Sequence, residues 1–297
     1  MNTVINTKNA NIIIDYNEVI NLFLHTLNIY GLLGNHGNHY SLRQDEKVIK
    51  SIDEKIKEDV KQGDRYFSYG KLQIYETGIK YILDNEIWKA RIDEININMG
   101  ITEMNFHLAL QKSWNEFYKN YWYSMLNEKE KLFKECINAF DFVENAEKME
   151  LAAKRKFLCD FYVFPSEALI YSGLKFNDNV CMGDLQVGDD MGFIHEGLHL
   201  LLNEEWAKDI EIIEIIKKAD DKEKYYHSWA TKFEQVLVIG LECCIKNKDD
   251  KIAEKYHKGC HVDDMFTISY PLVKEYYNNG CNEDIEKLML RIISRTI

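Results

Sequence analysis

One apolar segment of the chain carries three polar side chains and constrains the fold more than any other. Residues 191–202 read MGFIHEGLHLLL, so His195, Glu196 and His199 lie among apolar residues at helical spacing, which predicts a mostly buried helix. Side chains four positions apart share one face of a helix, so both imidazole rings can reach the same ion. Buried polar groups need partners, and a metal ion would supply one. The alternative is that all three are satisfied inside an ordinary core.

The spacing of these residues predicts the chemistry of a zinc hydrolase. His195 and His199 are the expected ligands of Zn2+, and Glu196 lies beside the first histidine without having to be a ligand. From there its carboxylate can accept a proton from a zinc-bound water. An aspartate at 189 or 190 can cap the start of the helix by accepting hydrogen bonds from its first amides.

The third metal ligand has to come from another segment. The extended motif with a third histidine is absent, because Leu202 and Glu205 stand where it needs glycine and histidine. Glu234, 35 residues after His199, is the predicted ligand, since a lone carboxylate is expensive in its apolar helical surroundings. Its alternative role is to pair with a lysine or a buried tyrosine. Glu242 is predicted to accept a hydrogen bond from a histidine N–H, or to be the ligand itself.

The overall composition limits the classes of molecule that the protein is expected to bind. Of its 297 residues 46% are hydrophobic and 12% aromatic, which is enough for a sizeable core. The net charge of −12 argues against nucleic acid and anionic membranes as partners, because both are polyanions. No apolar run approaches the length of a membrane span. A peptide or protein substrate is compatible with this charge, and the sequence leaves the oligomeric state open.

The cysteines indicate a reducing compartment. Their number, seven, is odd, and their spacing suggests no disulfide framework. The first residues lack a cationic start followed by an apolar core, so no secretory signal is visible. We therefore expect a cytoplasmic protein, although a mature secreted form would look similar.

The order of the predicted elements gives a fold class of α+β, mainly helical. Residues 1–155 are expected to form a mostly helical N-terminal region, with one strand at 11–15 and a long helix at 129–155 that is broken near Asn145. Residues 156–297 are expected to hold a small sheet followed by the motif helix. The predicted strands of this second part are 160–165, 168–171 and 179–182, and its later helices are 204–219, 228–246 and 284–296.

This order resembles the core of the zincin-type metallopeptidases. Strands, then a helix with HExxH, then a buried acid-bearing helix occur in that sequence over residues 160–245. With Glu234 as third ligand the site is similar to the gluzincins, and more loosely to the catalytic domains of anthrax lethal factor and the Pro-Pro endopeptidases. The resemblance implies a zincin-like core over residues 156–297, with a small sheet above the HExxH helix.

The resemblance also implies further site residues. In that fold an edge strand above the active-site helix pairs with an extended substrate, and here Cys181, Met182 and Gly183 would belong to it. The named families carry a tyrosine seven residues before the ligand glutamate, which steadies the oxyanion. Here that offset falls on His227, with Tyr226 beside it, and either side chain could donate the hydrogen bond.

The sequence thus predicts a zinc-dependent metallopeptidase in which a Glu-activated water hydrolyses a peptide bond. The alternative from another class is a zincin-fold metal-binding regulatory or binding protein without peptidase activity. A third reading has no metal at all. Substrate, cleavage preference and the choice between endo- and exopeptidase are not set by these residues.

Overall fold

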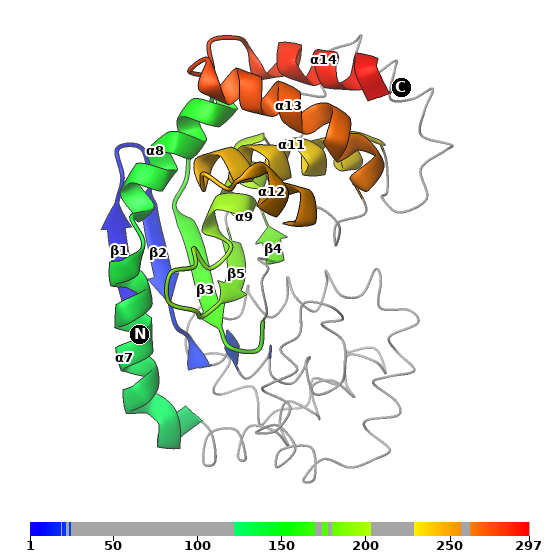
Figure 1. Cartoon of the computed structure of the whole chain (residues 1–297). Helices are drawn as coiled ribbons and strands as arrows, with labels where there is room; N and C mark the ends of the chain where they lie inside the picture. The colour runs from blue at the N-terminus through cyan, green and yellow to red at the C-terminus, as the bar shows by residue number, and fades with distance from the viewer. Residues whose placement is uncertain are drawn as a thin grey trace, which may run out of the picture. The chain divides into compact units, whose positions relative to one another are not determined.

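The structure is a computed structural model that describes residues 1–18, 20, 21, 24, 122–169, 174–177, 180–202, 229–256 and 262–296 (Figure 1). The chain divides into two compact units, each assembled from separate segments. The sheet unit comprises Met1–Ile5, Ile12–Phe140 and Phe161–Phe193, and the helical unit comprises Asn6–Asn11, Asp141–Asp160 and Ile194–Ile297. Neither unit coincides with the division into residues 1–155 and 156–297 that the sequence suggested. The expected class, α+β and mainly helical, is confirmed.

A five-stranded mixed sheet is built in the order β1-β2-β3-β5-β4. The middle strand, β3, pairs in parallel with β2 on one side and with β5 on the other, and β4 is antiparallel to β5. Five of the six residues of β3 are buried, which is the pattern of a strand covered on both faces. The strands are β1 (Asn2–Asn6), β2 (Asn11–Asp15), β3 (Phe161–Ser166), β4 (Leu174–Asn177) and β5 (Val180–Asp184).

Three of the four predicted strands are confirmed as β2, β3 and β5. Of the strand expected at 168–171 the structure describes two residues: Ala168 lies in a turn, and Leu169 forms an isolated bridge rather than part of a strand. Ser166 explains the turn, since its hydroxyl oxygen accepts a hydrogen bond from the amide of Ala168 at 3.1 Å. Strands β1 and β4 were not predicted; both are short, and residues on β1 alternate only between exposed and half-buried positions.

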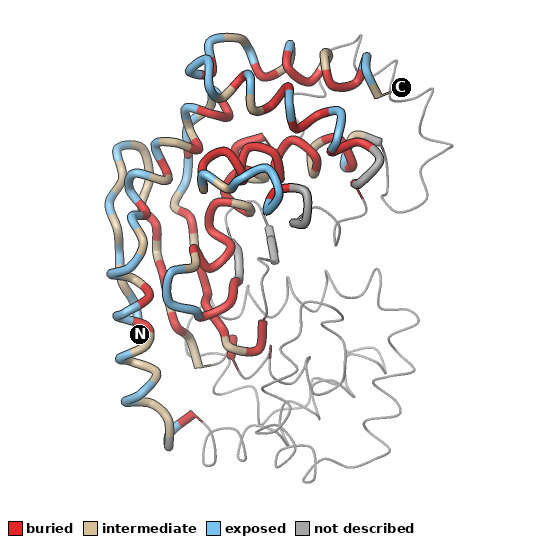
Figure 2. Tube along the Cα trace, viewed as in Figure 1, coloured by how far each residue is buried: buried red, intermediate tan, exposed pale blue. Residues whose placement is uncertain are grey.

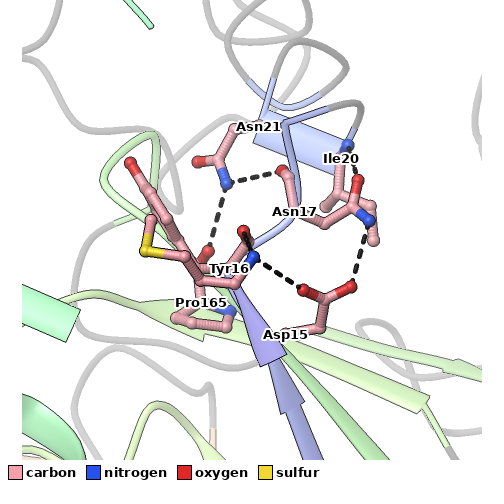
Figure 3. Close-up of polar contacts among 7 residues, drawn as sticks. Asp15, Tyr16, Asn17, Ile20, Asn21 and Pro165 are labelled. Carbon is pink, nitrogen blue, oxygen red and sulfur yellow. Dashed lines mark hydrogen bonds and ion pairs between the residues drawn. The ribbon is translucent and has the colours of Figure 1, made fainter. Parts of the chain in front are cut away.

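The end of β2 is tied to β3 by asparagine side chains (Figure 3). The Nδ2 atom of Asn21 donates to the carbonyl of Asn17 at 2.9 Å and to the carbonyl of Pro165 at 3.3 Å. The Oδ1 atom of Asn17 accepts from the amide of Ile20 at 3.2 Å, and its Nδ2 atom donates to Asp15 at 3.1 Å. Polar side chains therefore satisfy the backbone where the strand turns into a helix.

The long helix expected at 129–155 is instead two helices. Helix α7 (Tyr123–Ala139) belongs to the sheet unit and α8 (Phe142–Ala153) to the helical unit. The break lies at residues 140–141 rather than near Asn145. Asp141 accounts for it, because its carboxylate accepts from the amide of Glu144 at 2.9 Å and caps the start of α8.

The helical unit is organised around one buried helix. Helix α11 (Trp229–Ile245) contacts α13 most extensively and also α8 and α14, and Figure 2 shows it buried along nearly all its described length. The predicted helices at 191–202, 228–246 and 284–296 are confirmed, whereas the helix at 204–219 lies outside the described residues. The other helices of this unit are α9 (Phe193–Leu202, in this unit from Ile194), α12 (Asp250–Tyr256), α13 (Asp263–Asn278) and α14 (Ile285–Thr296).

Two of these helices were not predicted. Helix α13 contains Pro271, which interrupts the pattern that a sequence search relies on, and α12 spans only seven residues. No helix in the described part of the chain is long and apolar enough to cross a bilayer.

Candidate metal centre

Helix α9 presents the two histidines on one face, as the four-residue spacing predicts. Their ring centroids are 5.0 Å apart with an interplanar angle of 71°. Gly197, between them, lets Met149 of α8 pack closely, because a Cβ atom there would lie 3.0 Å from the Sδ atom of Met149 and push that side chain aside. The apolar residues of the helix fix its rotation, since Ile194 and Leu198 are fully buried.

His195 is held by a buried carboxylate from α11. Its Nδ1 atom lies 2.9 Å from Oε2 of Glu242, and the other carboxylate oxygen accepts from Lys246 Nζ at 2.8 Å. Burial by itself raises the pKa of Glu242, but Lys246 and His195 outweigh it and hold this pKa well below its usual range. Burial lowers the pKa of His195, and the hydrogen bond and charge of Glu242 more than offset that, so the net pKa is raised. Glu242 is therefore an ionised acceptor, and Nδ1 of His195 carries the hydrogen.

His199 is held in the same way by a second glutamate of the same helix. Its Nδ1 atom lies 2.7 Å from Oε1 of Glu234, whose side chain is 12% exposed. A carboxylate only accepts, so Nδ1 of His199 also carries its hydrogen. Histidines that bind metals are commonly oriented by such a carboxylate on the ring nitrogen that does not touch the ion. In both rings this leaves Nε2 as the atom free to act as a ligand.

Both Nε2 atoms face a single amide, that of Gln235. Oε1 of Gln235 lies 3.1 Å from Nε2 of His199, and Nε2 of Gln235 lies 3.3 Å from Nε2 of His195. The two rings therefore direct the same nitrogen toward one place. Two imidazole nitrogens and an amide oxygen are donors that a divalent cation accepts, so the residues present fit a metal ion.

Glu196 differs from the two histidines, because the described part of the chain offers it no hydrogen-bond partner. It is only 5% exposed, yet within the described part of the chain no hydrogen bond or ion pair holds its carboxylate. It lies close enough to His195 for its charge to help raise the pKa of that imidazole. A nearly buried carboxylate costs free energy unless something pairs with it, and a water molecule or substrate proton would do so.

The predicted third ligand, Glu234, is brought to the site, but it contacts His199 at Nδ1 rather than at Nε2. Glu242 meets His195 in the contact that the sequence suggested for it. Among the described residues no three His, Cys, Asp or Glu side chains gather as ligands of one ion. Sequence reasoning missed Gln235, which directly follows Glu234. The available signal was its spacing of seven from Glu242, which puts both on one stripe of α11.

The predicted substrate strand forms as β5, but it is not an edge strand. Cys181 and Met182 lie on β5, and both residues pair with β3 on one side and β4 on the other. The expectation that this strand is the free edge is therefore wrong, and among the described strands β4 lies at that end of the sheet. Gly183 has a structural reason to be glycine: a Cβ atom would lie 1.7 Å from the carbonyl oxygen of Met191. The oxyanion candidates Tyr226 and His227 lie outside the described residues.

Comparison with known proteins gives no match: no protein-family model, no curated protein and no solved structure is significantly similar to this chain. The zincin resemblance thus stays a prediction drawn from one motif and the order of elements. Chemical inference about this site rests on the contacts of α9 and α11.

Proposed function

We propose that the protein is a zinc-dependent metallopeptidase with a zincin-type core, in which His195 and His199 hold the ion through Nε2. The observation that carries this proposal is the pair of carboxylate contacts from α11. Glu242 and Glu234 each take the Nδ1–H of one histidine, which fixes the tautomer that a metal requires. One such pair occurs readily in a protein core. Two pairs on rings four residues apart, with both free nitrogens facing one place, favour a metal.

The proposed reaction is hydrolysis of a peptide bond. A bound zinc ion would polarise the scissile carbonyl and make an attacking water more acidic. Glu196 accepts the proton of that water and afterwards delivers it to the leaving amine. Its burial beside the histidines supports this role, because among the described residues no other side chain competes for the carboxylate. An oxyanion donor is still needed, and Tyr226 and His227 remain the candidates.

The cysteines are compatible with a cytoplasmic location as part of the proposal. Those whose side chains the structure describes are all free, and most are buried. Burial raises the pKa of Cys136 to about 11, and that of Cys243 to about 12, so both stay protonated and unreactive. Such thiols act as small apolar residues of the core.

The decisive variant is Glu196→Gln, which removes the base while keeping the shape of the side chain. We expect turnover of a peptide library to fall by about 10²–10⁴-fold, the usual contribution of a general base, while the zinc content is retained. Glu147→Gln is the matched control, because Glu147 is exposed on α8 of the same unit and the same chemical change should leave both measurements unaltered. Equal proteolysis by Glu196→Gln and wild type would refute the proposal.

A second candidate is a metal-binding protein of the same core that does not cleave peptides. The observation in its favour is the amide of Gln235, which closes the space between the two Nε2 atoms. In this candidate the amide stays between the histidines and fills the space that a substrate would need. Titration with a hydroxamate separates the two candidates: an open site binds the chelator in the presence of zinc and is inhibited, whereas a closed site does neither.

A further inference from the structure

Gln235 cannot satisfy both histidines by hydrogen bonding alone. When both rings are neutral and each gives its Nδ1–H to a glutamate, both present a lone pair at Nε2. The NH2 group of Gln235 can donate to His195, but its carbonyl oxygen then meets the lone pair of His199 at 3.1 Å. Turning the amide by half a turn only moves this clash of two acceptors to His195. An amide has one donor group and one acceptor group, so it cannot donate a hydrogen bond to both Nε2 atoms at once.

A cation removes the mismatch, because it accepts lone pairs from both nitrogens and from the amide oxygen. A second proton on one ring would remove it as well, by adding a positive charge to that imidazole, whereas a metal ion accepts the lone pairs and leaves both rings neutral. We propose that Gln235 is the third protein ligand of the metal, and that Glu234 and Glu242 are positioning residues that act through Nδ1 of the two histidines. This inference rests on the proposed function, since it needs a metal at the histidines, and it names a different ligand from the one the sequence suggested.

The geometry of α11 supports Gln235 independently of the hydrogen bonds. Glu242 is seven residues after Gln235 and eight after Glu234. In a helix of 3.6 residues per turn Gln235 is therefore only about 20° away from Glu242 around the axis, whereas Glu234 is about 80° away. Glu242 is fixed against His195. Gln235 thus lies on the same side of α11 as Glu242. Glu234 lies farther around the helix, where it reaches Nδ1 of His199.

The proposed ligand set has a chemical consequence. Two neutral histidines and a glutamine carry no charge, so no ligand offsets the charge of the ion. Glu234 and Glu242 contact the histidines instead of the ion. Zinc held by neutral ligands is a strong Lewis acid, as in carbonic anhydrase, where three histidines bring the pKa of bound water near 7. The expected cost is weaker binding than a carboxylate ligand would give.

The test is cobalt and zinc titration of the full chain after chelation, with the cobalt absorption spectrum as the readout of the ligand set. We expect Gln235→Ala to weaken binding by about 10–100-fold and to alter the spectrum, and Gln235→Glu to tighten binding by about tenfold. Glu234→Gln should change affinity by less than about tenfold and leave the spectrum intact, because an amide oxygen still accepts the Nδ1–H. Gln186→Ala, at an exposed position, is the matched control.

The outcomes separate this inference from the function it rests on. A spectrum that changes in Glu234→Gln but not in Gln235→Ala makes Glu234 the ligand and overturns the inference, while the metallopeptidase proposal survives. A wild type that takes up neither metal overturns both. If Gln235→Ala fails to fold, Gln235→Glu decides the matter, because it keeps the volume of the side chain: unchanged affinity and spectrum would exclude Gln235 as a ligand.

Discussion

The two histidines of the site are held in different surroundings by the same kind of contact. Glu242, beside His195, is 1% exposed and also accepts from Lys246, whereas Glu234, beside His199, is 12% exposed and has no ion pair with a lysine or arginine among the described residues. The first region is a buried network of three ionisable groups. The second is a single contact whose carboxylate is less deeply buried.

The difference separates two roles that look alike in the sequence. Removing Glu242 would take the acceptor from both Lys246 and His195, so this carboxylate belongs to the core as well as to the site. Glu234 is less deeply buried than Glu242 and contacts one described side chain, His199, so it is expected to contribute less to folding. The comparison therefore predicts that stability and metal binding respond differently to changes in the two regions.

The largest expected effect is that of Glu242→Ala on the stability of the metal-free protein. Removing one partner of a buried charged network costs about 3–5 kcal/mol, because Lys246 and His195 lose their acceptor. Glu234→Ala should cost about 1 kcal/mol or less, since its contact is partly exposed. The measurement is the free energy of unfolding in urea, followed by tryptophan fluorescence. Glu147→Ala, exposed on α8, should show no loss, and equal losses at 234 and 242 would break the comparison.

The next effect is the stabilisation by bound zinc, which should depend equally on the two histidines. At free zinc about 100 times its dissociation constant, the folded wild type gains about 2.7 kcal/mol over the metal-free form. His195→Ala and His199→Ala should each lose most of this gain, because each removes one ligand. Without metal, His195→Ala should be less stable than His199→Ala, because it leaves the buried carboxylate of Glu242 with one partner fewer. A zinc gain that persists in either variant would contradict the shared site.

The smallest effect is expected at Lys246, which distinguishes the buried region from the exposed one. Lys246→Met keeps the apolar stem of the side chain and removes its ammonium group. We expect a loss of about 1–2 kcal/mol, because Glu242 retains His195 and the lysine is itself 22% exposed. Thermal unfolding with and without zinc measures it. A loss as large as that of Glu242→Ala would show that the ammonium, not the carboxylate, organises this region.

Periodicity and local composition were enough to predict most of the elements near the site. The alternation in Asn11–Asp15, the aromatic run in Phe161–Ser166 and the apolar spacing in Trp229–Ile245 each report a local preference of the chain. The misses have local causes as well. Asp141 caps a new helix inside a continuous pattern, and Pro271 hides a helix that its neighbours hold together.

Sheet order was beyond the sequence because it depends on pairing between distant segments. Val180–Asp184 has the composition of a strand, but nothing in it says whether β4 will cover its outer side. For the same reason the sequence could not show that Gly183 packs against the backbone of Met191, and it suggested a substrate contact there. A glycine signals a close approach without naming what approaches.

By itself the sequence determined that His195, Glu196 and His199 share a helix, because a spacing of four is a local property of the backbone. It also determined that a buried acid-bearing helix follows. Only the tertiary structure decided that the glutamates of α11 contact Nδ1 of each ring. It also decided that Gln235 is the residue of α11 that faces the Nε2 atoms. Consecutive residues differ by about 100° around a helix, so the rotation of α11 about its axis decides whether Glu234 or Gln235 faces the Nε2 atoms. That rotation is set by the packing of α11 against α8, α13 and α14.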